Sequence, residues 1–313
     1  MSMNVIMRIG RRRPELVALA GTGALGLLAA AAALADWGAL AAAASESPQA
    51  TLGILGTEFA ATWPAIFAFD LGRYLVAAVA MAAVVALILR HGRWRRRIQP
   101  APPRPEDFRR ELAFSVRTAL IFSLMGFLIY LGFRAGLFVV DPGIGPRGYG
   151  YAALSLAGII VAHDAYFYWT HRTMHHRRLF RFFHLLHHRS TTPSSFAAYS
   201  FAWPEAVVQA IFMPLWLLFV PMQATALFVF MTVMIVRNVM GHAGVELHAP
   251  AFVTSRWLSW LSTTTHHDLH HQRFAGNYGL YFTWWDKLMG TEIADYGSRF
   301  LEAAARPCEG ETL

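Results

Sequence analysis

The sequence predicts an all-α, polytopic integral membrane protein. We expect a helical bundle of about four spans plus a helical hairpin, with a histidine-rich site for two metal ions on the cytoplasmic side. The 313-residue chain is 56% hydrophobic and 15% charged, whereas soluble domains carry about 25% charged residues. Several apolar stretches approach the roughly 20 residues that a helix needs to cross a bilayer. In addition, 13 of the 14 histidines lie between His163 and His271.

The first two predicted spans cover residues 16–34 and 67–89. The basic segment Arg8–Arg13 precedes the first span, which is longer than the apolar core of a usual signal peptide. We therefore interpret it as an uncleaved anchor, with a cleaved signal peptide as the alternative. The second span leads into eight arginines between positions 90 and 110. Arginine-rich loops beside apolar spans are typically cytoplasmic, so this loop sets the predicted orientation.

Two further spans are expected at residues 112–133 and 149–169, joined by a short turn rich in glycine and proline. Residues 206–236 are also apolar, but 31 helical residues would extend about 46 Å, which is too long for one crossing. Pro214 and Pro221 interrupt this stretch, so it is predicted to be a helical hairpin. A hairpin keeps all the clustered histidines on the cytoplasmic side.

Three histidine motifs have the spacing of metal ligands. Histidines three or four residues apart on a helix share a face, so each motif presents converging nitrogens. One metal ion binds about four to six ligands, so eight imidazoles indicate two adjacent ions. The motifs are HRTMH with His171 and His175, HLLHH with His184, His187 and His188, and HDLHH with His267, His270 and His271.

Two isolated histidines and three carboxylates extend this site. His242, in the sequence GHAG, is predicted to be a ninth ligand. His163 is predicted to be either a ligand or a hydrogen-bond partner of a ligand. Asp164, Asp268 and Asp286 are candidates to accept N–H bonds from the ligating histidines.

The ligand chemistry limits the choice of metal. The chain has a single cysteine, Cys308, which excludes a thiolate cluster. Imidazole binds zinc, copper, nickel and iron. An excess of neutral nitrogen ligands around two ions, beside lipid-accessible helices, favours redox reactions with dioxygen. Two iron ions, forming a di-iron site, are therefore predicted, with zinc as the alternative.

Three sequence blocks resemble those of the sterol desaturase and fatty acid hydroxylase superfamily, whose members are integral membrane di-iron oxygenases. The blocks are YWTHRTMHH at 168–176, FRFFHLLHHRSTTPSSFAAYS at 180–200 and NYGLYFTWWDKLMGT at 277–291. The resemblance covers about residues 112–292, and it implies that the eight motif histidines and His242 hold the metals on the cytoplasmic face. Some sterol-desaturating members have a histidine in the block matching SFAWPEA, where this chain has Trp203 and Pro204. The lipid class therefore stays open.

The resemblance implies an oxygen-dependent oxidoreductase that hydroxylates or desaturates an unactivated C–H bond of a lipid. Its electrons would come from an external ferredoxin or cytochrome with its reductase, because the sequence contains no haem-attachment, iron–sulfur or dinucleotide-binding motif. A metal-transport membrane protein and a di-zinc membrane hydrolase are the alternatives. No nucleic-acid partner is expected, because the arginines flank apolar spans.

Three regions are expected along the chain. Residues 1–110 form an N-terminal membrane region with two apolar spans and the arginine-rich loop. Residues 111–292 form a catalytic domain that resembles fatty acid hydroxylases, and residues 293–313 form a C-terminal tail. We expect the protein to reside in a bacterial inner membrane.

Overall fold

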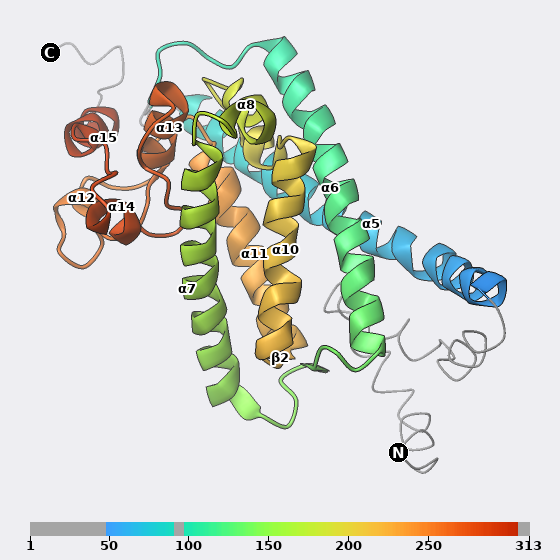
Figure 1. Cartoon of the computed structure of the whole chain (residues 1–313). Helices are drawn as coiled ribbons and strands as arrows, with labels where there is room; N and C mark the ends of the chain where they lie inside the picture. The colour runs from blue at the N-terminus through green and yellow to red at the C-terminus, as the bar shows by residue number, and fades with distance from the viewer. Residues whose placement is uncertain (1–47, 91–96, 306–313) are drawn as a thin grey trace, which may run out of the picture. The chain divides into compact units, whose positions relative to one another are not determined.

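The computed structural model describes residues 48–90 and 97–305 of the chain. The first predicted span, at residues 16–34, and its basic head lie outside the described residues. The described chain is mostly helical (Figure 1), with two short strands, β1 (Val140–Asp141) and β2 (Met222–Gln223), that pair in parallel. The predicted all-α fold class is confirmed.

Four helices are long and apolar enough to cross a membrane. Between 11% and 33% of each apolar window is buried, so most of these side chains face outward, where lipid would contact them. The spans predicted at 67–89, 112–133 and 149–169 are confirmed, although the first of these helices begins well before residue 67. The four helices are α5 (Pro48–Arg90), α6 (Pro105–Arg134), α7 (Gly148–Met174) and α11 (Ala224–Gly241).

The hairpin predicted over residues 206–236 is confirmed as two helices, α10 (Trp203–Phe219) and α11, separated by a turn that contains β2. The Tyr151 hydroxyl donates to the Pro221 carbonyl at 2.8 Å and fixes this turn. Pro214, expected to interrupt the stretch, lies inside α10. Membrane helices tolerate an internal proline because neighbouring groups satisfy the carbonyl that the proline leaves free.

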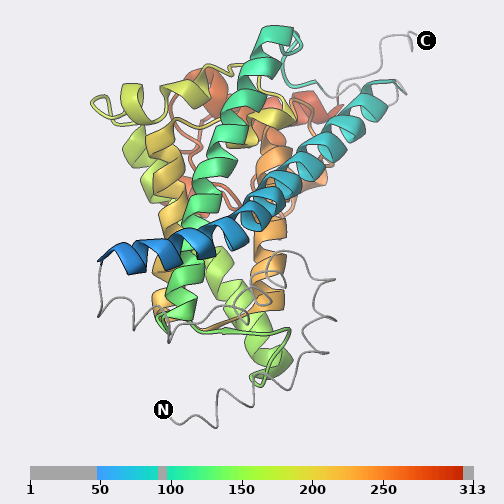
Figure 2. The same ribbon diagram turned by 90° about the vertical axis from the view of Figure 1, so that its right-hand side faces the viewer.

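The chain forms two compact units, and each long helix contributes one segment to each unit. Within the first unit, α5 crosses α6 (Figure 2), and Ile66 packs with Phe127. Gly126 permits this close crossing, because a Cβ there would approach Ile66 to 2.9 Å. The described residues of the first unit are 48–72, Leu120–Ile159 and Ala210–Met231.

The second unit contains Arg73–Ala119, Ile160–Gln209 and the chain from Thr232 to residue 305. Short helices dominate it, and all of the clustered histidines lie in it. The short helices are α8 (Phe180–Phe183), α9 (Leu185–His188), the 3-10 helix η2 (Ser195–Tyr199), α12 (Ala251–Thr254), α13 (Thr264–Arg273), α14 (Trp284–Leu288) and α15 (Tyr296–Ala305).

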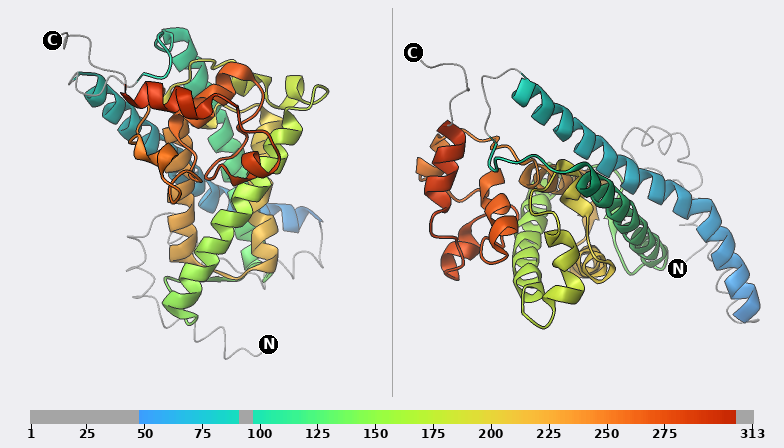
Figure 3. Two further views of the ribbon diagram at one scale, coloured as in Figure 1. Left: turned by 90° about the vertical axis from the view of Figure 1, so that its left-hand side faces the viewer. Right: turned by 90° about the horizontal axis from the view of Figure 1, so that it is seen from above.

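Helix α13 carries the last histidine motif, and polar groups fix its N-terminus. The Glu246 carboxylate accepts the Thr265 N–H at 2.8 Å, and negative charge at this end of a helix is stabilising. Helix α13 packs against α15 through Leu269 and Phe300 (Figure 3). The region after residue 293, predicted only as a tail, thus contains a helix that supports the histidine-bearing helix.

Candidate metal centre

Nine histidine side chains form two groups in the second unit. In each group, one nitrogen of every ring lies within 4.8 Å of the corresponding nitrogens of the others. The five-histidine group is His171, His175, His184, His188 and His270, and the four-histidine group is His187, His242, His267 and His271.

Each HxxHH motif supplies both groups. Its first and last histidines, four residues apart, join one group, and the middle histidine joins the other. His184 and His188 thus belong to the five-histidine group while His187 belongs to the four-histidine group. In the second motif the assignment is reversed, because only His270 joins the five-histidine group. Successive residues on a helix point in directions about 100° apart, so the two adjacent histidines that end each motif face different groups. The two motifs therefore tie the groups together.

Hydrogen bonds fix which ring nitrogen carries the proton. Backbone carbonyl oxygens can only accept, so an Nδ1 atom that bonds to a carbonyl must be protonated and the Nε2 atom of that ring must have a free lone pair. Four rings meet this condition. The bonds run from His171 to Tyr278 at 2.9 Å, His175 to Phe274 at 3.0 Å, His270 to Gly276 at 2.7 Å and His242 to Asn238 at 2.7 Å.

The Nε2 atoms of each group face one another at 2.9 to 3.3 Å. His188 lies 3.1 Å from His175 and 3.0 Å from His270, and His242 lies 3.1 Å from His267. A ring nitrogen carries at most one proton, so His188 can donate to only one of the free lone pairs of His175 and His270. The single free lone pair of His242 can likewise accept from only one of the three rings that face it. The remaining contacts repel unless a cation lies between the nitrogens. Such spacings match nitrogens that share one ion at about 2.0–2.1 Å. The residues present therefore fit two metal ions.

Burial keeps histidines of both groups neutral. It lowers the pKa of His175 and of His242 to about 4 and lowers the pKa of His267 and His270 well below the usual value. A charged imidazole would lose its hydration inside the protein, which disfavours the protonated form. The rings are therefore deprotonated and ready to bind metal at neutral pH.

Acid is expected to destabilise the metal-free protein. The folded-state pKa values of about 4 for His175 and His242 lie below the ordinary value of 6.5. The unfolded chain therefore binds more protons in this window, so stability that is fully present above pH 6.5 is lost as the pH falls toward 4. Thermal unfolding of chelator-treated protein in detergent, followed across this window, measures the effect. A melting temperature that stays constant through the window would contradict it.

The carboxylates predicted to orient the histidines have other roles, so that prediction is wrong. Asp164 accepts the Tyr281 N–H at 2.9 Å, Asp268 accepts from Gln99 at 3.0 Å, and Asp286 accepts two backbone N–H groups. Within the part of the chain that the structure describes, none of the three accepts a hydrogen bond from a histidine of either group.

The carboxylate that does face a ligand candidate is Glu205, in the first turn of α10. Its Oε1 atom lies 2.7 Å from Nδ1 of His184, and both side chains are almost completely buried. The sequence signal was present, because Glu205 is the single acidic residue at the start of an otherwise apolar helix. A buried carboxylate needs a partner, and here the partner is His184.

His163 lies outside both groups. Its Nδ1 atom is 2.9 Å from the Tyr281 hydroxyl, and its ring lies two helical turns before His171 on α7. Its role as a ligand stays a prediction. His176 and His266 also lie outside the groups, and His266 is fully buried with its Nε2 atom 3.6 Å from Asp286.

The fatty acid hydroxylase family model matches residues 156–291, a range that includes all nine grouped histidines. The Delta(7)-sterol 5(6)-desaturase of Gibberella zeae is 29% identical over 190 residues, which are 60% of this chain and 57% of that protein. Methylsterol monooxygenase 1 of Rattus norvegicus is 28% identical over 149 residues, 47% of this chain and 49% of the relative. Lathosterol oxidase of Homo sapiens is 27% identical over 186 residues, 58% of this chain and 60% of the relative.

The matched part of the chain spans about half the length of these curated relatives. No solved structure matches the chain.

Proposed function

Because this chain belongs to the sterol desaturase and fatty acid hydroxylase superfamily, we propose that it is an integral membrane di-iron oxygenase. It hydroxylates or desaturates an unactivated C–H bond of a lipid, with dioxygen as the oxidant and electrons from an external donor. The named activities of the relatives, which include sterol desaturation and methylsterol oxidation, support a lipid as the substrate.

The observation that carries the proposal is the convergence of imidazole Nε2 atoms in both groups, four of them with a free lone pair. We propose that the five-histidine and four-histidine groups each hold one ion, with histidines as the only side-chain ligands of both. Hydrolytic zinc sites usually combine histidine with carboxylate, so a purely imidazole set favours iron over a di-zinc hydrolase. When bound, the two irons supply the activation of dioxygen that breaking an unactivated C–H bond requires.

The surrounding side chains exclude water from this chemistry. The rings of Phe167 and Phe180 lie 5.1 Å from His171 and 5.2 Å from His175, respectively. Phe167 also packs with Leu280 in an apolar cluster. An apolar shell of this kind keeps solvent away from a reactive site, and it provides the contact surface that a hydrocarbon chain needs.

Two further parts of the proposal concern the surroundings of the enzyme. An external ferredoxin or cytochrome is needed, because the sequence carries no redox cofactor motif of its own.

We place the histidines on the cytoplasmic side, because the arginine-rich segment that follows α5 is typical of cytoplasmic loops. Protease cleavage of that segment in inside-out vesicles, but not in sealed cells, would support this orientation.

Metal analysis of the detergent-purified protein tests the function. We expect about two irons per chain, and Mössbauer spectra after anaerobic reduction and exposure to oxygen should show a coupled ferric pair. Turnover of a lipid should require an added reduced donor. Stoichiometric zinc that persists after expression in iron-rich, zinc-poor medium would instead support the hydrolase.

A further inference from the structure

One short backbone segment orients three of the five histidines in the five-histidine group. The carbonyl oxygens of residues 274, 276 and 278 accept the Nδ1–H groups of His175, His270 and His171. We name residues 274–278 the carbonyl segment. Because it uses alternate carbonyl groups, the position of each histidine depends on the backbone conformation of the whole segment.

The carbonyl segment has a backbone conformation that few residues adopt freely. The φ angles of Phe274, Gly276 and Asn277 are 60°, 77° and 52°, all in the left-handed region that disfavours side chains with a Cβ. A Cβ at Gly276 would also lie 2.6 Å from the carbonyl oxygen of Thr291. Such a conformation persists only where surrounding groups hold it in place.

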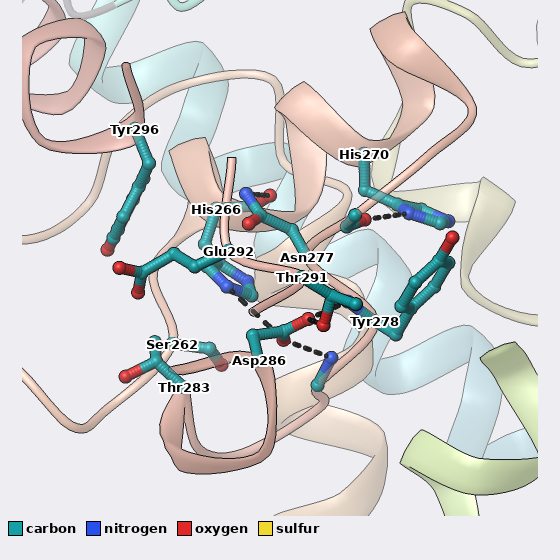
Figure 4. Close-up of polar contacts among 12 residues, drawn as sticks. Ser262, His266, His270, Asn277, Tyr278, Thr283, Asp286, Thr291, Glu292 and Tyr296 are labelled. Atoms are coloured by element: carbon teal, nitrogen blue, oxygen red, sulfur yellow. Dashed lines mark hydrogen bonds and ion pairs between the residues drawn. The ribbon is translucent and has the colours of Figure 1, made fainter. Parts of the chain in front are cut away.

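Two fully buried side chains hold the carbonyl segment (Figure 4). Asp286 accepts the N–H of Tyr278 at 2.9 Å with one oxygen and the N–H of Gly279 at 2.8 Å with the other. The amide of Asn277 donates to the carbonyl of His266 at 2.9 Å. Both Asp286 and Asn277 are 0% exposed, so water cannot replace these bonds.

Thr291 connects Asp286 to helix α7. Its hydroxyl donates to Asp286 at 2.8 Å. The proton of that hydroxyl is therefore used, so Thr291 must accept from the Tyr168 hydroxyl, which lies 2.9 Å away. Asp286 thus acts on the five-histidine group indirectly. It holds the backbone whose carbonyls bond to the histidines, and it accepts no hydrogen bond from the five rings themselves.

The four-histidine group does not use this segment. His242 donates to Asn238 within its own helix. Within the described residues, no hydrogen bond joins His187, His267 or His271 to residues 274–278. The two groups therefore have separate orienting elements.

We propose that Asp286 is a positioning residue that sets the metal affinity of the five-histidine group alone, by holding the carbonyl segment in its left-handed conformation. In D286N, one amide oxygen would replace two carboxylate oxygens, so one of the two backbone N–H groups would face an N–H₂ group. The carbonyls of the segment would then shift, and three histidines would lose their alignment. This inference rests on the proposed function only in requiring that both groups bind metal.

The experiment is a metal titration of the full-length protein in detergent, with iron(II) added anaerobically in competition with a chelator. Removing groups that orient ligands typically weakens metal binding about 10–100-fold. We expect D286N to lose at least about tenfold in affinity at one of its two sites and to keep the affinity of the other. T291V, which removes one bond to Asp286, should show a smaller loss at the same site.

Double variants identify the weakened site. D286N combined with H171A should bind one ion, as H171A alone does, because both changes affect the five-histidine group. D286N combined with H242A should bind almost none at the same chelator concentration. D164N is the matched control. Asp164 is also 0% exposed, and it accepts the backbone N–H groups of Tyr281 and Phe282, which follow the carbonyl segment in the chain. We expect D164N to retain both affinities.

The outcomes separate this inference from the proposed function. A wild-type protein that binds fewer than two ions contradicts the proposed function. A wild-type protein with two ions and a D286N variant with two unchanged affinities overturns the inference alone, and so does equal weakening of both sites. If D286N does not fold, T291V decides, because unchanged affinities in T291V would overturn the inference in the same way.

Discussion

The H242A variant is expected to lose one of its two metal ions and at least about 100-fold in turnover. The Nε2 atom of His242 lies within 3.3 Å of the Nε2 atoms of all three other members of its group, at His187, His267 and His271. Removing a group that merely orients a ligand costs about 10–100-fold, so removing a ligand at the centre of the group should cost more. The remaining three rings would lose the nitrogen that all of them contact.

Metal content by mass spectrometry and turnover with an added electron donor measure this effect. H176A is the matched control, because His176 is an exposed histidine that directly follows a member of the five-histidine group and belongs to neither group. We expect H176A to keep two ions and its turnover. Two ions and full turnover in H242A would show that three histidines suffice, which the geometry argues against.

The histidine groups were largely predictable because their determinants are local. Spacings of three and four residues on a helix are visible in the sequence, and they place eight of the nine histidines together. His242 lies 55 residues after His187, its partner in the HLLHH motif, and 25 residues before His267, so local spacing says nothing about it. Its place in the set came from the resemblance and from the hairpin, which returns the chain to the other histidines.

The groups that orient the histidines were not predictable from side-chain types. Three of the five histidines in one group bond to backbone carbonyls, and a carbonyl has no signature in the sequence. Proximity along the chain also misled the prediction of carboxylate partners. Asp268 directly follows His267, but successive residues on a helix point in directions about 100° apart, so its side chain faces Gln99 and Gln272.

Local sequence also failed to predict where two helices begin or end. Helix α5 is longer than predicted, and α10 continues past Pro214. Apolar composition finds a span, yet the helix can continue beyond the apolar stretch, as α5 does from Pro48. A proline usually ends a soluble helix, but the partners that compensate for it in a bundle come from elsewhere in the chain.

The E205A variant is expected to weaken metal binding at the five-histidine group and to lower turnover by about 10–100-fold, the usual effect of removing a partner that orients a ligand. Glu205 and His184 are 1% and 2% exposed, so water cannot take the place of the carboxylate. Without that carboxylate, Nδ1 of His184 would lose its 2.7 Å ion-pair contact and lie beside an apolar methyl group. The ring would no longer be held in place and would rotate away from its Nε2 contact with His171, now 2.9 Å.

The E205Q variant separates the loss of the negative charge from the loss of the side chain. A glutamine keeps an acceptor oxygen of the same reach, so it should restore the orientation of His184 and most of the metal affinity lost in E205A. A carboxylate would also make the ring a stronger ligand. Glutamine keeps the size of the side chain and one oxygen, so a smaller deficit in E205Q than in E205A is the expected order. Chelator competition and turnover, measured in parallel on both variants, test it. If E205Q is as impaired as E205A, the charge is what the site requires; if both bind metal as the wild type does, the 2.7 Å contact at His184 has no part in holding the ligand.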